Sequence, residues 1–168
     1  ALASANTWPS TIGWLWASIA SVLVLGYALR LRAMHQRLQK RNQVDDPRVL
    51  ETLSRMSQKA GLRAAPELTE SAELGSPIAL GMGSHREICV PTRALQELDA
   101  GELEALLGHE LAHHMRRDAL RLNVMNALQA VFFFQPLFRV AARDIQFAAE
   151  EQCDAWAANQ LDDRFAMA

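Results

Sequence analysis

The sequence predicts a mainly helical α+β protein, in which a membrane-spanning helix precedes a globular domain with a small antiparallel sheet. Three observations support this fold class. An uncharged apolar segment lies near the N-terminus, short strand-like segments occupy residues 62–91, and stretches with helical spacing follow to about residue 161. The 168 residues fit one ordinary domain plus an appendage, and the net charge of −2 gives no indication of nucleic-acid binding.

Residues 11–29 (TIGWLWASIASVLVLGYAL) are the predicted transmembrane helix. They carry no charge, and they are numerous enough to cross a hydrocarbon core of ~30 Å as a helix. Basic residues follow this segment instead of preceding it, which argues against a secretory signal peptide. The positive-inside rule then predicts that residues 1–10 are extracytoplasmic and that everything after residue 29 is cytoplasmic.

The rest of the chain is predicted to divide into two parts. Residues 30–43 form a basic juxtamembrane helix whose charges meet the head groups of the lipid bilayer, and residues 44–168 form the globular domain. The chain has two cysteines, which fits a reducing compartment, and the absence of an initiator methionine suggests a piece of a longer protein.

The predicted chemistry lies in the motif His109-Glu110-x-x-His113. A capped helix is expected to begin at Asp99, with Glu102 completing a capping box, and to continue through this motif. Two histidines four residues apart share one helix face, so both imidazoles can bind a single Zn²⁺. Glu110 then lies where it can act as the general base on a water molecule.

A zinc peptidase site needs a third protein ligand, and the well-placed carboxylates downstream on a predicted helix are Glu150 and Glu151. Glu150 is favoured because Asp154 lies one turn further on the same face and can accept the second N–H of a ligand histidine. His114 is expected to be a packing residue, and Cys153 a small buried residue. Arg143 is expected to form a salt bridge, with stabilisation of an oxyanion as the alternative.

Two segments have roles that the sequence leaves open. The strand formed by Ile88, Cys89 and Val90 is predicted to bind substrate by β-augmentation, if the sheet presents an exposed edge near the metal; the alternative is a purely structural sheet. Residues 122–138 form a second apolar stretch, which is interpreted as a buried helix or as one whose Phe132-Phe133-Phe134 end enters the membrane interface.

Three segments resemble the BlaR/MecR-type membrane metallopeptidases, the β-lactam sensor–transducer family. They are HELAHHMRRD (residues 109–118), FFFQPL (residues 132–137) and EEQCDAWA (residues 150–157), where the family shows HELxHxxRxD, a WFNPL-like segment and ExxCD. The segment SPIALGMGSHREICVP (residues 76–91) resembles the strand pair of the family. The middle segment departs from the pattern at Phe133, Phe134 and Gln135, and no SxxK of a penicillin-binding domain is present.

The resemblance implies a gluzincin, with one zinc held by His109, His113 and Glu150, Glu110 catalytic and Asp154 supporting a ligand. It implies a bacterial inner-membrane protein whose peptidase domain faces the cytoplasm, cleaves itself or a regulator in signal transduction, and is joined in some members to an extracytoplasmic sensor domain. Two alternatives stay open: a quality-control peptidase of the HtpX/CAAX-protease type, and a non-catalytic zinc-binding signalling module.

Overall fold

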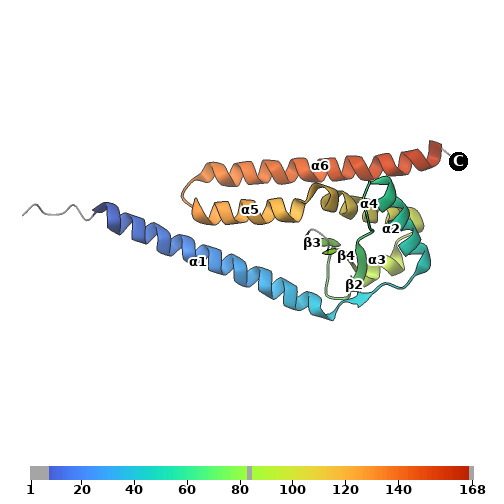
Figure 1. The fold of residues 1–168 in the computed structure, drawn as a ribbon, viewed down its shortest axis with the longest axis horizontal. Coiled ribbons are helices and arrows are strands. Elements are labelled where there is room, and N and C mark those ends of the chain that lie inside the picture. The colour runs from blue at the N-terminus through green and yellow to red at the C-terminus, as the bar shows by residue number, and fades with distance from the viewer. Residues whose placement is uncertain (1–7, 83–84, 167–168) are drawn as a thin grey trace, which may run out of the picture.

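The computed structural model describes residues 8–82 and 85–166. Three long helices, α1 (Trp8–Arg37), α5 (Asp118–Val131) and α6 (Pro136–Ala166), extend together from a compact part. That part contains a four-stranded sheet and the helices α2 (Pro47–Lys59), α3 (Thr92–Glu97) and α4 (Ala100–Arg116), as Figure 1 shows. The mainly helical α+β fold class is confirmed.

The N-terminal apolar segment and most of the basic segment after it form the single helix α1. It contains the one stretch in the described part of the chain that is long and apolar enough to cross a membrane, and most of that stretch is exposed. Helix α1 ends at Arg37, so the expected juxtamembrane helix over residues 30–43 is too long: a 3-10 turn (Leu38–Lys40) and strand β1 (Asn42–Gln43) follow. Residues 1–7 of the predicted extracytoplasmic segment lie outside the described residues.

The sheet is mixed and has the strand order β1-β2-β4-β3. Strands β2 (Glu67–Ser71), β3 (Ile78–Met82) and β4 (His85–Pro91) lie where the sequence predicts them. Strand β4 pairs antiparallel with β3 but parallel with β2, so the prediction of a purely antiparallel sheet is wrong in that pair. The β3–β4 hairpin places β3 at the outer edge and leaves the other side of β4 for β2.

The substrate-binding strand predicted at Ile88, Cys89 and Val90 is a further correction. These residues lie in β4, an interior strand hydrogen-bonded on both sides, and all three are fully buried. A continuous apolar triplet is typical of a strand covered on both faces, which explains the outcome. Ile88 and Val90 pack with Leu53 and Leu107 in the hydrophobic core, and β3 is the strand at the edge.

Helices α2 and α4 of the compact part begin at residues whose side chains cap them, whereas the N-cap of α3, Pro91, makes no such hydrogen bond. Asp46 accepts a hydrogen bond from the backbone N–H of Arg48 at the start of α2 (2.9 Å), with Pro47 in the first turn. Asp99 and Glu102 form the predicted capping box of α4. Helix α4 ends at Arg116, its C-cap Arg117 has a left-handed φ of 58°, and α5 starts at the next residue. This sharp corner brings the first turn of α5 back beside the end of α4.

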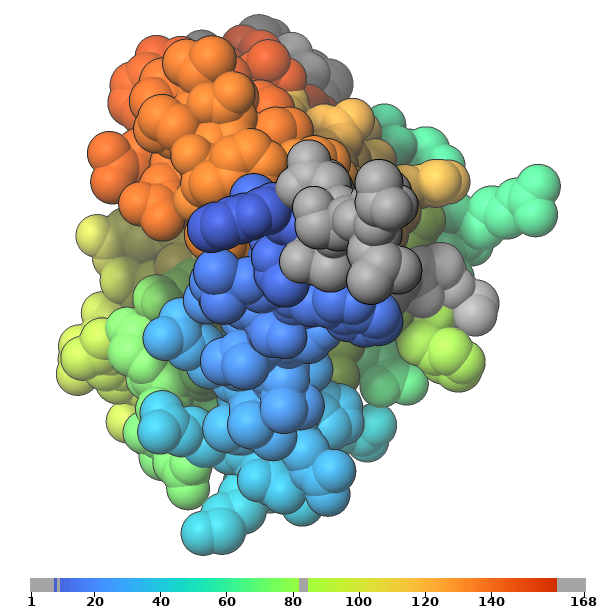
Figure 2. Space-filling model, turned by 90° about the vertical axis from the view of Figure 1, so that its left-hand side faces the viewer, coloured from blue at the N-terminus to red at the C-terminus, as the bar shows by residue number. Residues whose placement is uncertain are grey.

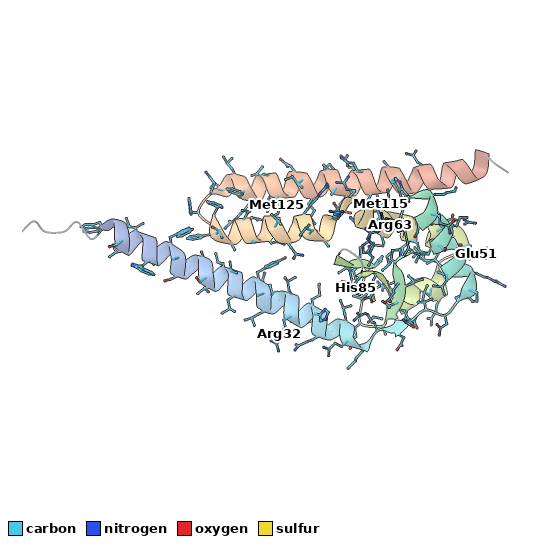
Figure 3. All side chains as sticks on the ribbon, viewed as in Figure 1. Arg32, Glu51, Arg63, His85, Met115 and Met125 are labelled. Atoms are coloured by element: carbon cyan, nitrogen blue, oxygen red, sulfur yellow. The ribbon has the colours of Figure 1, made fainter. Side chains whose placement is uncertain are left out.

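Helices α5 and α6 form a hairpin that runs beside the apolar part of α1. Seen along that end of the molecule, the hairpin tip and α1 lie next to each other (Figure 2). The Trp16 indole N–H donates to the carbonyl of Val131 (2.9 Å), and Met125 lies between α5 and α6 (Figure 3). The hairpin is therefore not the fully buried helix considered above: several large apolar side chains are exposed on it, among them Phe134, Leu137, Val140 and Phe147.

Candidate metal centre and active site

Helices α4 and α6 bring His109, His113 and Glu150 together. His109 Nε2 lies 3.1 Å from His113 Nε2 and 3.4 Å from Glu150 Oε2, and His113 Nε2 lies 3.8 Å from the same carboxylate oxygen. Ligands bound tetrahedrally at zinc distances lie about 3.3 Å from one another. The three atoms therefore have the separations that one zinc ion requires.

The hydrogen bonds on the far side of each imidazole indicate which ring nitrogens are free for a metal. His109 Nδ1 lies 2.8 Å from Asp154 Oδ1, and His113 Nδ1 lies 2.9 Å from Asp118 Oδ2. A carboxylate partner requires a proton on Nδ1, which leaves an unprotonated lone pair on each Nε2. In that tautomer, two lone pairs and a carboxylate oxygen face one another, an arrangement that a bound cation would stabilise.

Asp118, which contacts the candidate ligand His113, is a candidate functional residue that the sequence pattern alone did not single out. It is buried in the first turn of α5, where Arg116 (Nε to Oδ2, 3.2 Å) and Arg121 (NH1 to Oδ1, 3.6 Å) flank its carboxylate. The signal for it was present, because Asp118 is the final residue of the HELxHxxRxD pattern. The carboxylate that orients His113 is thus itself held in place by two guanidinium groups.

Cys153 is buried, as predicted, and contacts the same histidine from α6. Its Sγ lies 3.4 Å from His113 Nδ1 and 3.8 Å from Asp118 Oδ2, so these three residues form a second cluster of metal-binding types. Burial, reinforced by the negative charge of Asp118, raises the pKa of the Cys153 thiol to about 12. A thiol that stays protonated is a poor ligand, and His113 Nδ1 already donates to Asp118, so this cluster supports the histidine.

Glu110 is buried between the two histidines on the helix and faces the same cavity. Burial raises the pKa of its carboxyl above the ordinary value of 4.5 and Glu150 raises it further, whereas His113, His109 and a hydrogen bond with the backbone of Ala79 lower it. A carboxylate with a raised pKa is a better proton acceptor near neutral pH, as a general base needs to be.

The other candidate residues lie away from the three converging atoms. His114 is buried, as expected of a packing residue, and its Nε2–H donates to the carbonyl of Glu87 (2.9 Å). Glu151 and Arg143 are exposed on α6. Neither lines the cavity beside the metal-binding atoms in the described part of the chain, which gives Arg143 no support as an oxyanion ligand.

A family model described as BlaR1 peptidase M56 matches residues 2–165. The chain belongs to the M56 peptidase family. Membership indicates a metallopeptidase, which acts on a protein or peptide, and it implies a metal ion for which His109, His113 and Glu150 are the candidate ligands. The apolar helix α1 suggests that this M56 protein is associated with a membrane.

More distant relatives of this M56 chain belong to the HtpX proteases. A protease HtpX homolog of Acidiphilium cryptum is 34% identical over 93 residues, which is 54% of this chain and 32% of the relative. A homolog from Methanopyrus kandleri is 34% identical over 92 residues, covering 52% of this chain and 29% of the relative. Protease HtpX of Xanthomonas axonopodis pv. citri is 34% identical over 89 residues, covering 50% and 29%. The matched region spans about a third of these relatives.

Proposed function

We propose that this M56 protein is a membrane-anchored, zinc-dependent endopeptidase of the gluzincin type. The observation that carries the proposal is the convergence of His109 Nε2, His113 Nε2 and Glu150 Oε2 beside the buried carboxylate of Glu110. Bound zinc would act as a Lewis acid and lower the pKa of a water molecule at the open coordination position. Its three ligands come from two helices that pack along each other, α4 and α6.

In this proposal Glu110 moves the proton. Its carboxylate accepts a proton from the water that attacks the scissile carbonyl and then donates it to the leaving amine, as a general base and acid in turn. Asp154 and Asp118 hold the two imidazoles in the tautomer that presents Nε2. Among the described strands, β3 pairs with β4 alone, and the hydrogen bond between the Ala79 backbone and Glu110 brings the outer edge of β3 next to the proposed general base.

The peptidase domain is proposed to face the cytoplasm. Arg30, Arg32 and Arg37 follow the apolar part of α1 on the side that leads into the compact part. A protease added to sealed inverted inner-membrane vesicles should degrade the domain, and one added to right-side-out vesicles should leave it intact. The opposite pattern would overturn this orientation without affecting the chemistry.

Two other functions compete with signal-linked cleavage of the protein itself or of a regulator. The HtpX relatives favour a quality-control peptidase, which would use the same residues on misfolded membrane proteins. A non-catalytic zinc module would use the same ligands without turnover. The signalling role follows only from the family resemblance. The decisive experiment therefore concerns zinc-dependent peptide hydrolysis, which a signalling peptidase and a quality-control peptidase share.

The test compares four forms of the chain in detergent: the parent, Glu110→Gln, Glu150→Gln and Glu151→Gln. Zinc content is measured by mass spectrometry and cleavage of unstructured casein by gel analysis. Glu110→Gln is expected to keep its zinc and to lose cleavage by a factor of about 10² or more, and Glu150→Gln to lose zinc. Glu151→Gln, the matched control, should behave as the parent.

Each remaining outcome refutes a different part of the proposal. Full activity in Glu110→Gln would exclude it as the general base, and unchanged zinc in Glu150→Gln would exclude it as a ligand. A parent protein that binds zinc tightly and cleaves nothing, in detergent or in lipid vesicles, would favour the non-catalytic module.

A further inference from the structure

A cavity of about 1190 Å³ connects the proposed catalytic centre to the end of the membrane helix. Its walls come from α1, from the edge strand β3, from α5, and from the helices α4 and α6 that carry His109, Glu110 and Glu150. Figure 1 shows the arrangement, with α1 approaching the hairpin near its tip and diverging from it towards the sheet. The cavity fills the space between the diverging elements, so α1 is a wall of the proposed active site as well as an anchor.

One face of α1 contributes to this wall. Tyr27, Leu31 and His35 line the cavity, and their spacing of four residues places them on one stripe of α1; Arg32, Met34 and Gln36 beside this stripe line the cavity as well. Leu29 lies about 200° around the helix from Tyr27 and does not line the cavity. The wall is therefore a defined surface of α1, next to the arginines that follow its apolar part.

Polar side chains hold α1 against α5 where the cavity ends. The Tyr27 hydroxyl lies 2.5 Å from Asn123 Oδ1 and accepts a hydrogen bond from Asn126 Nδ2 (3.3 Å). All three residues line the cavity. Polar groups next to an apolar helix are costly unless they are paired, so this cluster fixes the distance between α1 and α5.

Strand β3 forms the opposite side and faces the cavity with Ile78, Ala79, Leu80 and Gly81. It pairs only with β4 among the described strands, so its second edge is available to an extended segment. Such a segment would lie between β3 and α1, with its backbone beside Glu110 and its outward side chains against Leu31 and His35.

Building on the proposed peptidase function, we propose that the Tyr27–Leu31–His35 face of α1 is the substrate-facing wall of the cleft. The substrate is then the extended juxtamembrane segment of a membrane-anchored protein. The stripe from Tyr27 to His35 rises about 12 Å along the helix, a length that about four extended residues span. The cleft thus accepts peptide bonds within roughly ten residues of the membrane anchor.

The first experiment varies the distance between anchor and cleavage site. A cleavable sequence, identified by mass spectrometry of casein digests, is placed about 5, 20 or 40 residues from a model transmembrane helix by Gly/Ser linkers. The reporters and the full chain are reconstituted in the same lipid vesicles. The reporter with the shortest spacing should be cleaved at least as fast as the one with the longest. Cleavage of the longest reporter alone would show that the site lies away from the membrane and would overturn the proposal.

The second experiment uses a matched pair of substitutions on α1. Leu31→Trp fills the cavity wall, whereas Leu29→Trp adds the same bulk on the far face; the parent side chains are 37% and 57% exposed. Leu31→Trp should raise the KM for the short reporter about ten-fold, with zinc content unchanged, and Leu29→Trp should not. Equal kinetics in both variants would overturn the role of this face.

A cross-linking measurement covers the case in which Leu31→Trp does not fold. Leu31→Cys and Leu29→Cys are each labelled with benzophenone maleimide in the Glu110→Gln background, which is expected to bind substrate without cleaving it. The native Cys89 and Cys153 are buried and remain unlabelled. Cross-links to the short reporter should form from position 31 and not from position 29, and the reverse would refute the inference. If the cross-linking result refutes this inference while the parent still cleaves casein, the proposed peptidase function stands. If the parent shows no zinc-dependent cleavage at all, both the peptidase function and this inference are refuted.

Discussion

Substituting Asp118 by Asn tests whether a buried carboxylate controls the affinity of the metal centre. Asp118 and Asp154 accept nearly identical hydrogen bonds from the two imidazoles, 2.9 Å and 2.8 Å long. Their side chains differ in burial, with 6% exposed for Asp118 and 73% for Asp154. Because bond length is matched, the pair Asp118→Asn and Asp154→Asn compares a buried carboxylate flanked by two arginines with an exposed one.

The expected magnitudes follow from this difference. Loss of a carboxylate that orients a ligand histidine costs about 10- to 100-fold in metal affinity, which is about 1.4 to 2.7 kcal/mol. Water screens and partly replaces the exposed Asp154, so Asp154→Asn should lie at or below the ten-fold end. Asp118→Asn should lie near the hundred-fold end, because it also leaves Arg116 and Arg121 without their carboxylate.

Zinc affinity is measured by competition with a fluorescent chelator, and circular dichroism confirms that each variant keeps its helices. The reasoning would be refuted if Asp154→Asn weakened zinc binding as much as Asp118→Asn, or if Asp118→Asn bound zinc as tightly as the parent. Either result would mean that the charge on the buried carboxylate does not polarise His113.

Three further predictions concern packing, pH and the metal. A Cβ at Gly108 would lie 3.0 Å from Met56 Cε and 3.6 Å from Ala157 of α6, so Gly108→Ala should be tolerated with a small shift of the flexible Met56 side chain. Gly108→Val should destabilise the fold by about 1–3 kcal/mol in chemical denaturation and weaken zinc binding through the adjacent ligand. Burial lowers the pKa of His114, so its imidazole binds a proton at higher pH in the unfolded chain than in the folded one. The contribution of His114 to the free energy of unfolding should therefore be complete above about pH 6.5 and be lost below it, by up to about 1.4 kcal/mol per pKa unit. His114→Gln should lack this dependence of stability on pH. Removal of zinc by a chelator should lower the midpoint of thermal unfolding, since zinc at about 100 times its Kd adds about 2.7 kcal/mol.

Local signals in the sequence predicted most of the helices and the two segments that carry the candidate metal ligands. Capping residues and helical spacing depend on neighbours within one or two turns, so they can be read without a tertiary structure. The same holds for the spacing of His109 and His113. Glu150 could be placed beside them only through the ExxxD spacing, and the structure brings its Oε2 to within 4 Å of both Nε2 atoms.

What the sequence did not reveal depends on pairings between distant segments. The sequence predicts β4 as the third strand of an antiparallel sheet. Its parallel pairing with β2 depends on how the β3–β4 hairpin is placed against β2, which is a contact between distant segments. The strand at the sheet edge is therefore β3, and Ile88 and its neighbours in β4 lie in the interior of the sheet. Asp118 reaches His113 only because the left-handed residue Arg117 turns α5 back towards α4.

The continuity of α6 has a mechanical consequence. A single helix runs from the exposed apolar end of the hairpin to Glu150 and Asp154, and Glu150 lies about 21 Å along it from Pro136. Such a continuous helix carries the proposed metal ligand Glu150 together with Asp154, whose carboxylate accepts a hydrogen bond from His109. A tilt at the hairpin end would move both groups as a unit against the histidines of α4, so forces on the distant end would be felt at the metal.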